Sequence, residues 1–172
     1  MKPALLVIDL QNDYFPGGAF PLWNTDATLA AVERCIGRAR AAGMPVVHIQ
    51  HVADPGQGIA PFFNTGTRGV EIHPRILAAA PDAPVVTKHF ADSFERTGLH
   101  ETLRSFGVDA LVLSGMMTQN CVTHTALSRS ADDYGKVTVL TDATTTVSDM
   151  LHAIALHALS TRVALAPSGK AI

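Results

Sequence analysis

Short apolar segments alternate with longer segments of helical character along the whole chain. The apolar segments cover residues 4–10, 45–50, 83–88, 110–114, 137–141 and 162–166, and they are typical of strands buried on both faces. The segments between them predict helices over 27–42, 74–80, 97–106, 121–134 and 148–160. This alternation predicts an α/β fold in which helices cover both faces of a parallel sheet.

Capping residues mark several ends of the predicted helices. Thr25 or Asp26 is suited to begin the first helix, Gly43 to end it, and Ser148 to begin the last one. A chain of 172 residues can bury a core without disulfide or metal cross-links. We therefore expect one domain over residues 1–172, a three-layer αβα sandwich of Rossmann-like type whose six-stranded parallel sheet has the order 3-2-1-4-5-6.

Composition and charge exclude some classes of partner. Hydrophobic residues make up 47% of the chain and charged residues 16%, and the formal net charge is −2 with both signs scattered. No basic surface for nucleic acid or anionic membranes is expected from this pattern. Cys35 and Cys121 are too few for a disulfide framework, and the N-terminal apolar run is too short for a signal peptide or a membrane span. A cytoplasmic protein is expected.

The segment from Val112 to Ala126 carries the clearest chemical signal. It passes from an apolar strand through the turn Gly-Met-Met-Thr to Cys121, just inside a predicted helix. Backbone N–H groups without a partner and the positive end of the helix dipole favour a thiolate and a developing oxyanion there. The position of Cys121 therefore suits a nucleophile.

Two further reactive side chains stand at predicted strand ends. Asp9 lies near the end of the first strand and Lys88 ends the third, while Cys121 follows the fourth. Because ligands bind beyond the carboxyl ends of such strands, the three side chains are expected to converge. Each has an ordinary alternative role: Asp9 as a turn cap, Lys88 as a solvated strand end, Cys121 as a small buried hydrophobe. The joint interpretation is better, because a buried carboxylate needs a partner.

Three segments carry a family resemblance. In order, they are Leu5-Leu-Val-Ile-Asp-Leu-Gln-Asn-Asp-Tyr14, Val85-Val-Thr-Lys-His-Phe-Ala-Asp-Ser-Phe94 and Leu113-Ser-Gly-Met-Met-Thr-Gln-Asn-Cys-Val-Thr-His-Thr-Ala126. They resemble the three signatures of the isochorismatase-like cysteine hydrolases. The resemblance implies a catalytic triad of Asp9, Lys88 and Cys121. It also implies a cis peptide bond between Met116 and Met117 and an oxyanion hole formed by the N–H groups of Met117 and Cys121.

The expected reaction is hydrolysis of a C–N bond in a small amide or ureido substrate, through a thioester on Cys121 and without a cofactor. Cys121 is either held as a thiolate or deprotonated by Asp9. Two alternatives stay open. One is the vinyl-ether hydrolysis of true isochorismatases, against which the cysteine argues. The other is a catalytically silent protein of the same fold that binds a metabolite or serves as an assembly subunit.

The resemblance fails at the metal site found in the nicotinamidases of this family. Those enzymes hold a metal through an Asp and two His residues. The segment Gln50-His-Val-Ala-Asp54 lacks their Asp-x-His spacing, and Phe62 stands where a further histidine would precede Gly66-Thr-Arg-Gly69. We therefore expect no metal, which makes nicotinamide a less favoured substrate. His48 and His51 could ligate an ion, but strand alternation favours packing or pocket roles.

Substrate recognition is expected from the loops. Apolar walls are expected from Phe15, Trp23, Phe62, Phe63 and Phe94, and polar contacts from Gln11, Asn64, Thr118 and Gln119. This lining suits a small, flat, weakly polar ligand. His124 shares a helix face with Cys121, and we expect packing or hydrogen bonding there before a catalytic role. Members of the family commonly form homo-oligomers, so a neighbouring subunit could supply Phe94.

Overall fold

The strands of the chain form one parallel sheet. The computed structural model describes residues 1–172 and contains β1 (Pro3–Ile8), β2 (Val46–His51), β3 (Val85–Lys88), β4 (Ala110–Met116), β5 (Lys136–Thr145) and β6 (Ala164–Ala166). Their order is β3-β2-β1-β4-β5-β6, and all neighbouring strands are parallel. The predicted fold class and strand order are confirmed.

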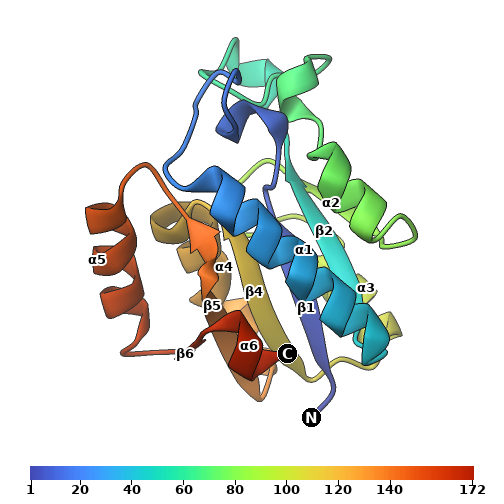
Figure 1. The fold of residues 1–172 in the computed structure, drawn as a ribbon. Coiled ribbons are helices and arrows are strands. Elements are labelled where there is room, and N and C mark those ends of the chain that lie inside the picture. The colour runs from blue at the N-terminus through green and yellow to red at the C-terminus, as the bar shows by residue number, and fades with distance from the viewer.

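Helices cover both faces of this sheet (Figure 1). One face carries α1 (Thr25–Ala41), α2 (Pro74–Ala79) and α6 (Ser168–Ala171), and the other carries α3 (Leu99–Ser105), α4 (Thr123–Ala126) and α5 (Asp149–Leu159). The side chains of β1 divide between two cores: Leu5 and Val7 pack under α1, while Leu6 and Ile8 pack on the opposite side. This division follows from the two-residue period of a strand. None of the helices combines the length and hydropathy that a membrane span requires.

The helix predicted after the fourth strand is wrong in extent. In place of one helix over 121–134, the chain forms a π-helical turn over Thr118–Val122, the short α4, and a 3₁₀ helix over Arg129–Asp133. Ser128 interrupts the helix, because its side chain accepts a hydrogen bond from the N–H of Ser130 and caps the following turn. Cys121 therefore sits in an irregular π-helical turn, in which the N–H of Val122 donates to the carbonyl of Met117.

Other element boundaries differ less. Asn24, in the left-handed region with φ of 56°, precedes α1, so neither Thr25 nor Asp26 is its N-cap. Ser148 caps α5 as predicted, by accepting a hydrogen bond from the N–H of Leu151. β5 continues beyond the predicted 137–141 to Thr145, and its register against β4 shifts beside Gly115.

The segments after β1 and β2 lie together beyond the carboxyl end of the sheet (Figure 1). Gln11 forms an isolated antiparallel bridge with Ile72, and the N–H of Asn12 donates to the carbonyl of Glu71. These contacts fix two loops against each other directly above the ends of the central strands.

Candidate active site

Asp9 leaves β1 in an uncommon backbone conformation. Its φ is 54°, a region that Asp populates more readily than most residues, and its side chain is fully buried. Beside it, Gly115 of β4 has a φ of 122°, and a Cβ at this glycine would lie 1.9 Å from the carbonyl oxygen of Ile8. Only glycine permits this approach. It brings the turn that precedes Cys121 up to the end of β1.

Lys88 ends β3 and points inward rather than into solvent. Its Nζ lies 3.0 Å from Oδ2 of Asp9 and donates to the carbonyls of Phe90, at 3.1 Å, and Ala91, at 3.3 Å. Burial disfavours the ammonium, but the charges of Asp9 and Cys121 outweigh this effect and raise the pKa of Lys88. Neither carboxylate oxygen of Asp9 has a hydrogen-bond partner, and Oδ2 takes part only in the ion pair with Lys88. The carboxylate therefore keeps unused acceptor capacity.

Cys121 lies in the π-helical turn and is almost fully buried. Burial raises the pKa of its thiol, the carboxylate of Asp9 raises it further, and Lys88 lowers it, with a net rise. The four residues of α4 provide only a weak dipole to offset this rise. Of the two expected states of Cys121, the thiol that gives its proton to Asp9 therefore fits better than a resting thiolate. The peptide bond between Met116 and Met117, just before this turn, is cis.

His51 joins the cluster formed by these three side chains. Its Nδ1 lies 3.1 Å from Nζ of Lys88, 3.9 Å from Oδ2 of Asp9 and 4.0 Å from Sγ of Cys121. Burial lowers the pKa of His51 to about 4, so the ring is neutral at pH 7. Because an ammonium only donates, Nδ1 accepts from Lys88. His48 points to the opposite face of β2, where Nε2 meets the carbonyl of Ala80 at 3.1 Å.

Three side chains of this cluster are of types that can also bind a metal ion. Ligand atoms of Asp9, His51 and Cys121 all lie within 4.8 Å of one another. The ammonium of Lys88 already contacts Asp9 and His51, so this donor set is matched to an amine. The nicotinamidase-type set does not fit either, because the carboxylate of Asp54 is exposed and accepts hydrogen bonds from Gly56 and Gln57 in its own loop.

A small cavity of about 190 Å³ opens onto Cys121. Its lining consists of Tyr14, His51, Ala53, Ala60, Pro61, Phe62, Phe63, Asn120 and Cys121. Phe62 and Phe63 were expected there. Tyr14, Ala53, Ala60, Pro61 and Asn120 were not expected, although Tyr14 and Asn120 lie inside the segments that carry the family resemblance.

Asp13 holds the aromatic wall of this cavity and was also missed. Its Oδ2 accepts a hydrogen bond of 2.7 Å from the N–H of Phe63, which has a φ of 61°, and Oδ1 accepts one of 3.0 Å from Ala19. A Cβ on Gly69 would lie 2.0 Å from Oδ1, so only glycine fits against the carboxylate. The loops after β1 and β2 therefore meet at one buried side chain.

Gln11 and Asn64 bind the protein's own backbone rather than facing a ligand. The amide of Gln11 donates to the carbonyls of His51 and Val70 and accepts from the N–H of His51. The amide of Asn64 bonds to both the N–H and the carbonyl of Ala60. Both amides are thus occupied, and their role is to shape the loops around the cavity.

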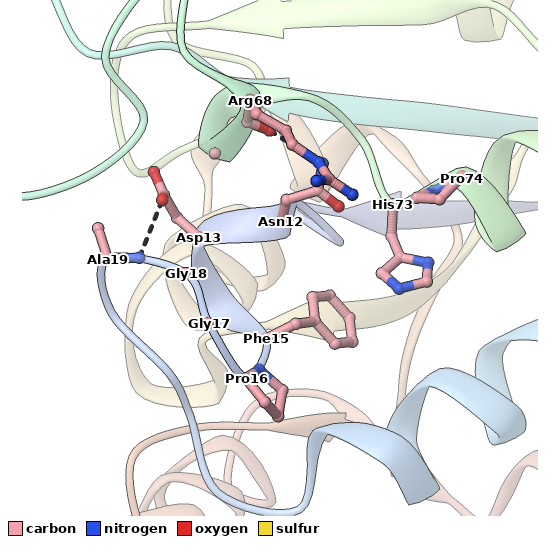
Figure 2. A pocket seen from close by; sticks show the side chains of 11 residues that line it. Asn12, Asp13, Phe15, Pro16, Gly17, Gly18, Ala19, Arg68, His73 and Pro74 are labelled. Atoms are coloured by element: carbon pink, nitrogen blue, oxygen red, sulfur yellow. Dashed lines mark hydrogen bonds between the residues drawn. The ribbon is translucent and has the colours of Figure 1, made fainter.

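Phe15 lies in a different hollow. A cavity of about 400 Å³ is bordered by Phe15, Arg68 and His73, and Figure 2 shows these side chains pointing toward one another. The ring of Phe15 packs 4.5 Å from that of His73. Asp13 lies at the border of this hollow, with the bond to Ala19 drawn in the figure. Phe15 is therefore not a wall of the cavity at Cys121.

The remaining expected contacts hold the nucleophile turn or lie elsewhere. The hydroxyl of Thr118 lies 2.9 Å from Nδ1 of His152, and Gln119 accepts a hydrogen bond from Thr146. Neither Trp23 nor Phe94 lines the cavity: Trp23 packs beside His152, and Phe94 packs 5.9 Å from Tyr134. His124 is exposed, and its Nδ1 lies 2.8 Å from the carbonyl of Asn120.

Known proteins resemble this chain in both sequence and fold. The isochorismatase domain family matches residues 3–168. The isochorismatase family protein YddQ of Bacillus subtilis is 40% identical over 149 residues, covering 86% of this chain and 80% of that protein. The maleamate amidohydrolase of Pseudomonas putida is 34% identical over 151 residues, covering 80% and 70%. The crystal structure of an isochorismatase-like hydrolase from Alkaliphilus metalliredigens has a TM-score of 0.88 at 27% identity, covering 99% and 96%. The chain belongs to the isochorismatase family.

Proposed function

We propose that this protein hydrolyses the C–N bond of a small amide or ureido substrate by a cysteine mechanism. The observation that carries the proposal is the buried cluster of Asp9, Lys88 and Cys121 beside a cavity of about 190 Å³. A carboxylate with unused acceptor capacity, an ammonium and a thiol are the parts that acyl transfer needs. The relative named as an amidohydrolase supports this reaction class.

Acylation begins when the thiol of Cys121 gives its proton to the carboxylate of Asp9. The sulfur forms a bond to the carbonyl carbon, and the C=O electron pair moves onto oxygen. The N–H groups of Met117 and Cys121 are proposed to bind this oxyanion. Lys88 stabilises the negative charge that develops on sulfur, since it already lowers the pKa of the thiol. His51 holds the ammonium in place from the other side.

Loss of the amine completes acylation, and hydrolysis of the thioester then returns the site to its starting state. The tetrahedral intermediate collapses, the C–N bond breaks, and Asp9 gives its proton to the leaving ammonia or amine. Water then attacks the thioester while Asp9 accepts a proton from it. When the C–S bond breaks, Asp9 returns this proton to the sulfur and the carboxylic acid leaves. Every proton passes through one carboxylate, and the lack of hydrogen-bond partners at the oxygens of Asp9 supports this role.

The test compares two cysteine variants. Cys121→Ala should reduce kcat/KM for ammonia release from a panel of amides and ureides by more than about 10³-fold. Cys35→Ala is the matched control. Cys35 is equally buried, but it belongs to α1 and faces the core, away from the cavity. Circular dichroism checks that both variants fold. A Cys121→Ala protein as active as the Cys35→Ala protein would disprove the mechanism.

A further inference from the structure

We propose that the acyl group of the substrate is uncharged and mainly hydrocarbon, so that amides carrying a carboxylate are poor substrates. This inference rests on the proposed function and concerns the cavity beside Cys121. The lining contains no Arg or Lys side chain, and six of its nine residues are hydrophobic. A carboxylate inside it would lose its hydration without gaining a cationic partner.

The polar groups of the lining are neutral. Burial lowers the pKa of His51 to about 4, so at pH 7 its imidazole carries no charge. Burial, and next the charge of Asp9, raise the pKa of Tyr14, which stays a phenol. Asn120 provides a carboxamide. These groups can hydrogen-bond an amide or a carbonyl, but they cannot neutralise an anion.

The nearby Lys and Arg side chains have other contacts or lie at another cavity. Lys88 is buried behind the cavity, where its ammonium contacts Asp9, His51 and two backbone carbonyls. Arg68 borders the separate hollow shown in Figure 2, together with His73. His89 does not line the cavity at Cys121; it lines a neighbouring one, and its Nδ1 lies 2.8 Å from the carbonyl of Val52. The ammonium of Lys88 is therefore already paired with the carboxylate of Asp9. A second carboxylate, on the acyl group, would be repelled by Asp9.

Volume and shape limit the size of the group. An apolar cavity of about 150 Å³ can hold one benzene molecule, and the cavity here measures about 190 Å³. Phe62 and Phe63 form one wall in an edge-to-face pair with ring centres 5.0 Å apart. Phe63 is fixed by its bond to Asp13. An acyl group of roughly six to eight non-hydrogen atoms fits such a space.

The test uses a pair of amides with the same shape. In 4-methylpentanamide, an isopropyl end occupies the place of the carboxylate in succinamate. We expect kcat/KM for 4-methylpentanamide to exceed that for succinamate by about 100-fold or more. In the Cys35→Ala protein, 4-methylpentanamide should also protect Cys121 from iodoacetamide at lower concentration than succinamate does.

A substitution in the wall provides the reciprocal test. Ala60 lines the cavity and is partly exposed, so a long side chain there can place its head group at the cavity mouth. Ala60→Arg should raise kcat/KM for succinamate at least about tenfold relative to Ala60→Met, the neutral control of similar length. An unchanged ratio between the two variants counts against a missing cation as the cause of discrimination.

Each result separates this inference from the proposed function. Equal or better turnover of succinamate overturns the inference and leaves the cysteine mechanism standing. Selective protection of Cys121 by 4-methylpentanamide without turnover of either amide supports the inference about binding and counts against the mechanism. Absence of protection by both amides overturns the inference, because the cavity then does not take groups of this size.

Discussion

The ammonium of Lys88 lies 3.0 Å from the carboxylate of Asp9, and both side chains are fully buried. Removing one member of such a pair leaves the other as an unpaired charge in a medium that solvates it poorly. The pair therefore links stability to chemistry: the same contact that gives the carboxylate of Asp9 a counter-ion also places the ammonium beside the thiol of Cys121.

The Lys88→Met variant tests this link. We expect it to lose about 3–5 kcal/mol of the free energy of unfolding, because Asp9 is left without a counter-ion. Urea denaturation measures the loss. The double variant Asp9→Asn/Lys88→Met should recover much of the stability while staying inactive, because Asn is uncharged and tolerates the φ of 54° at this position. Wild-type stability in the single variant would show that the buried pair is not formed.

Gly115→Ala tests the close approach of β4 to β1. A Cβ at position 115 would lie 1.9 Å from the carbonyl oxygen of Ile8, and the φ of 122° is strained for any other residue. We expect a loss of at least about 2 kcal/mol and reduced turnover. Gly37→Ala is the control: it lies inside α1 with open space around it, and it should gain about 0.5–1 kcal/mol. Equal effects of the two substitutions would contradict the described backbone.

The lowered pKa of His51 should make the free energy of unfolding depend on pH. Its pKa of about 4 in the folded protein lies below the ordinary value of 6.5, so the unfolded chain binds the proton first. The stabilisation is present above pH 6.5 and is lost as the pH falls toward 4, by up to about 3 kcal/mol. The His51→Asn variant keeps an acceptor near the position of Nδ1 and should lose less stability over this range. Parallel curves for the two proteins would refute the prediction.

Asp13→Asn tests the anchoring of the aromatic wall. An amide cannot accept both the N–H of Phe63 and that of Ala19 with the geometry of the carboxylate, so one bond is lost. We expect KM to rise about tenfold with a smaller change in kcat, and faster hydrogen exchange at Phe63. Asp133→Asn, at an exposed position, serves as the control. If both variants exchange alike at Phe63, Asp13 does not hold the wall.

Periodicity predicted most of the fold because each central strand is buried on both faces. The six strands and their order need only apolar runs and intervening helices, and the polar residues at strand ends then stand out. Asp9, Lys88 and Cys121 were found for this reason. The helix after Cys121 was overextended because Ser128 ends it by a side-chain hydrogen bond, which leaves no trace in the spacing of apolar residues.

Loop side chains could not be assigned from residue type alone. Gln11, Asn64 and Thr118 are polar residues in the segments around the site, yet each bonds to the protein itself. Phe15 faces another hollow. His51 joins the cluster only because β2 ends at the register where His51 pairs with Lys88. The expected homo-oligomer stays a prediction that light scattering tests.

The central claim is that Cys121 carries the acyl group during turnover. Acid quenching during hydrolysis of an accepted amide, followed by digestion and mass spectrometry, examines the peptide that contains this residue. The account predicts that this peptide gains the mass of the acyl group while the peptide of Cys35 does not. Hydrolysis at the wild-type rate by the Cys121→Ala protein, with no acylated peptide at any time point, would contradict it.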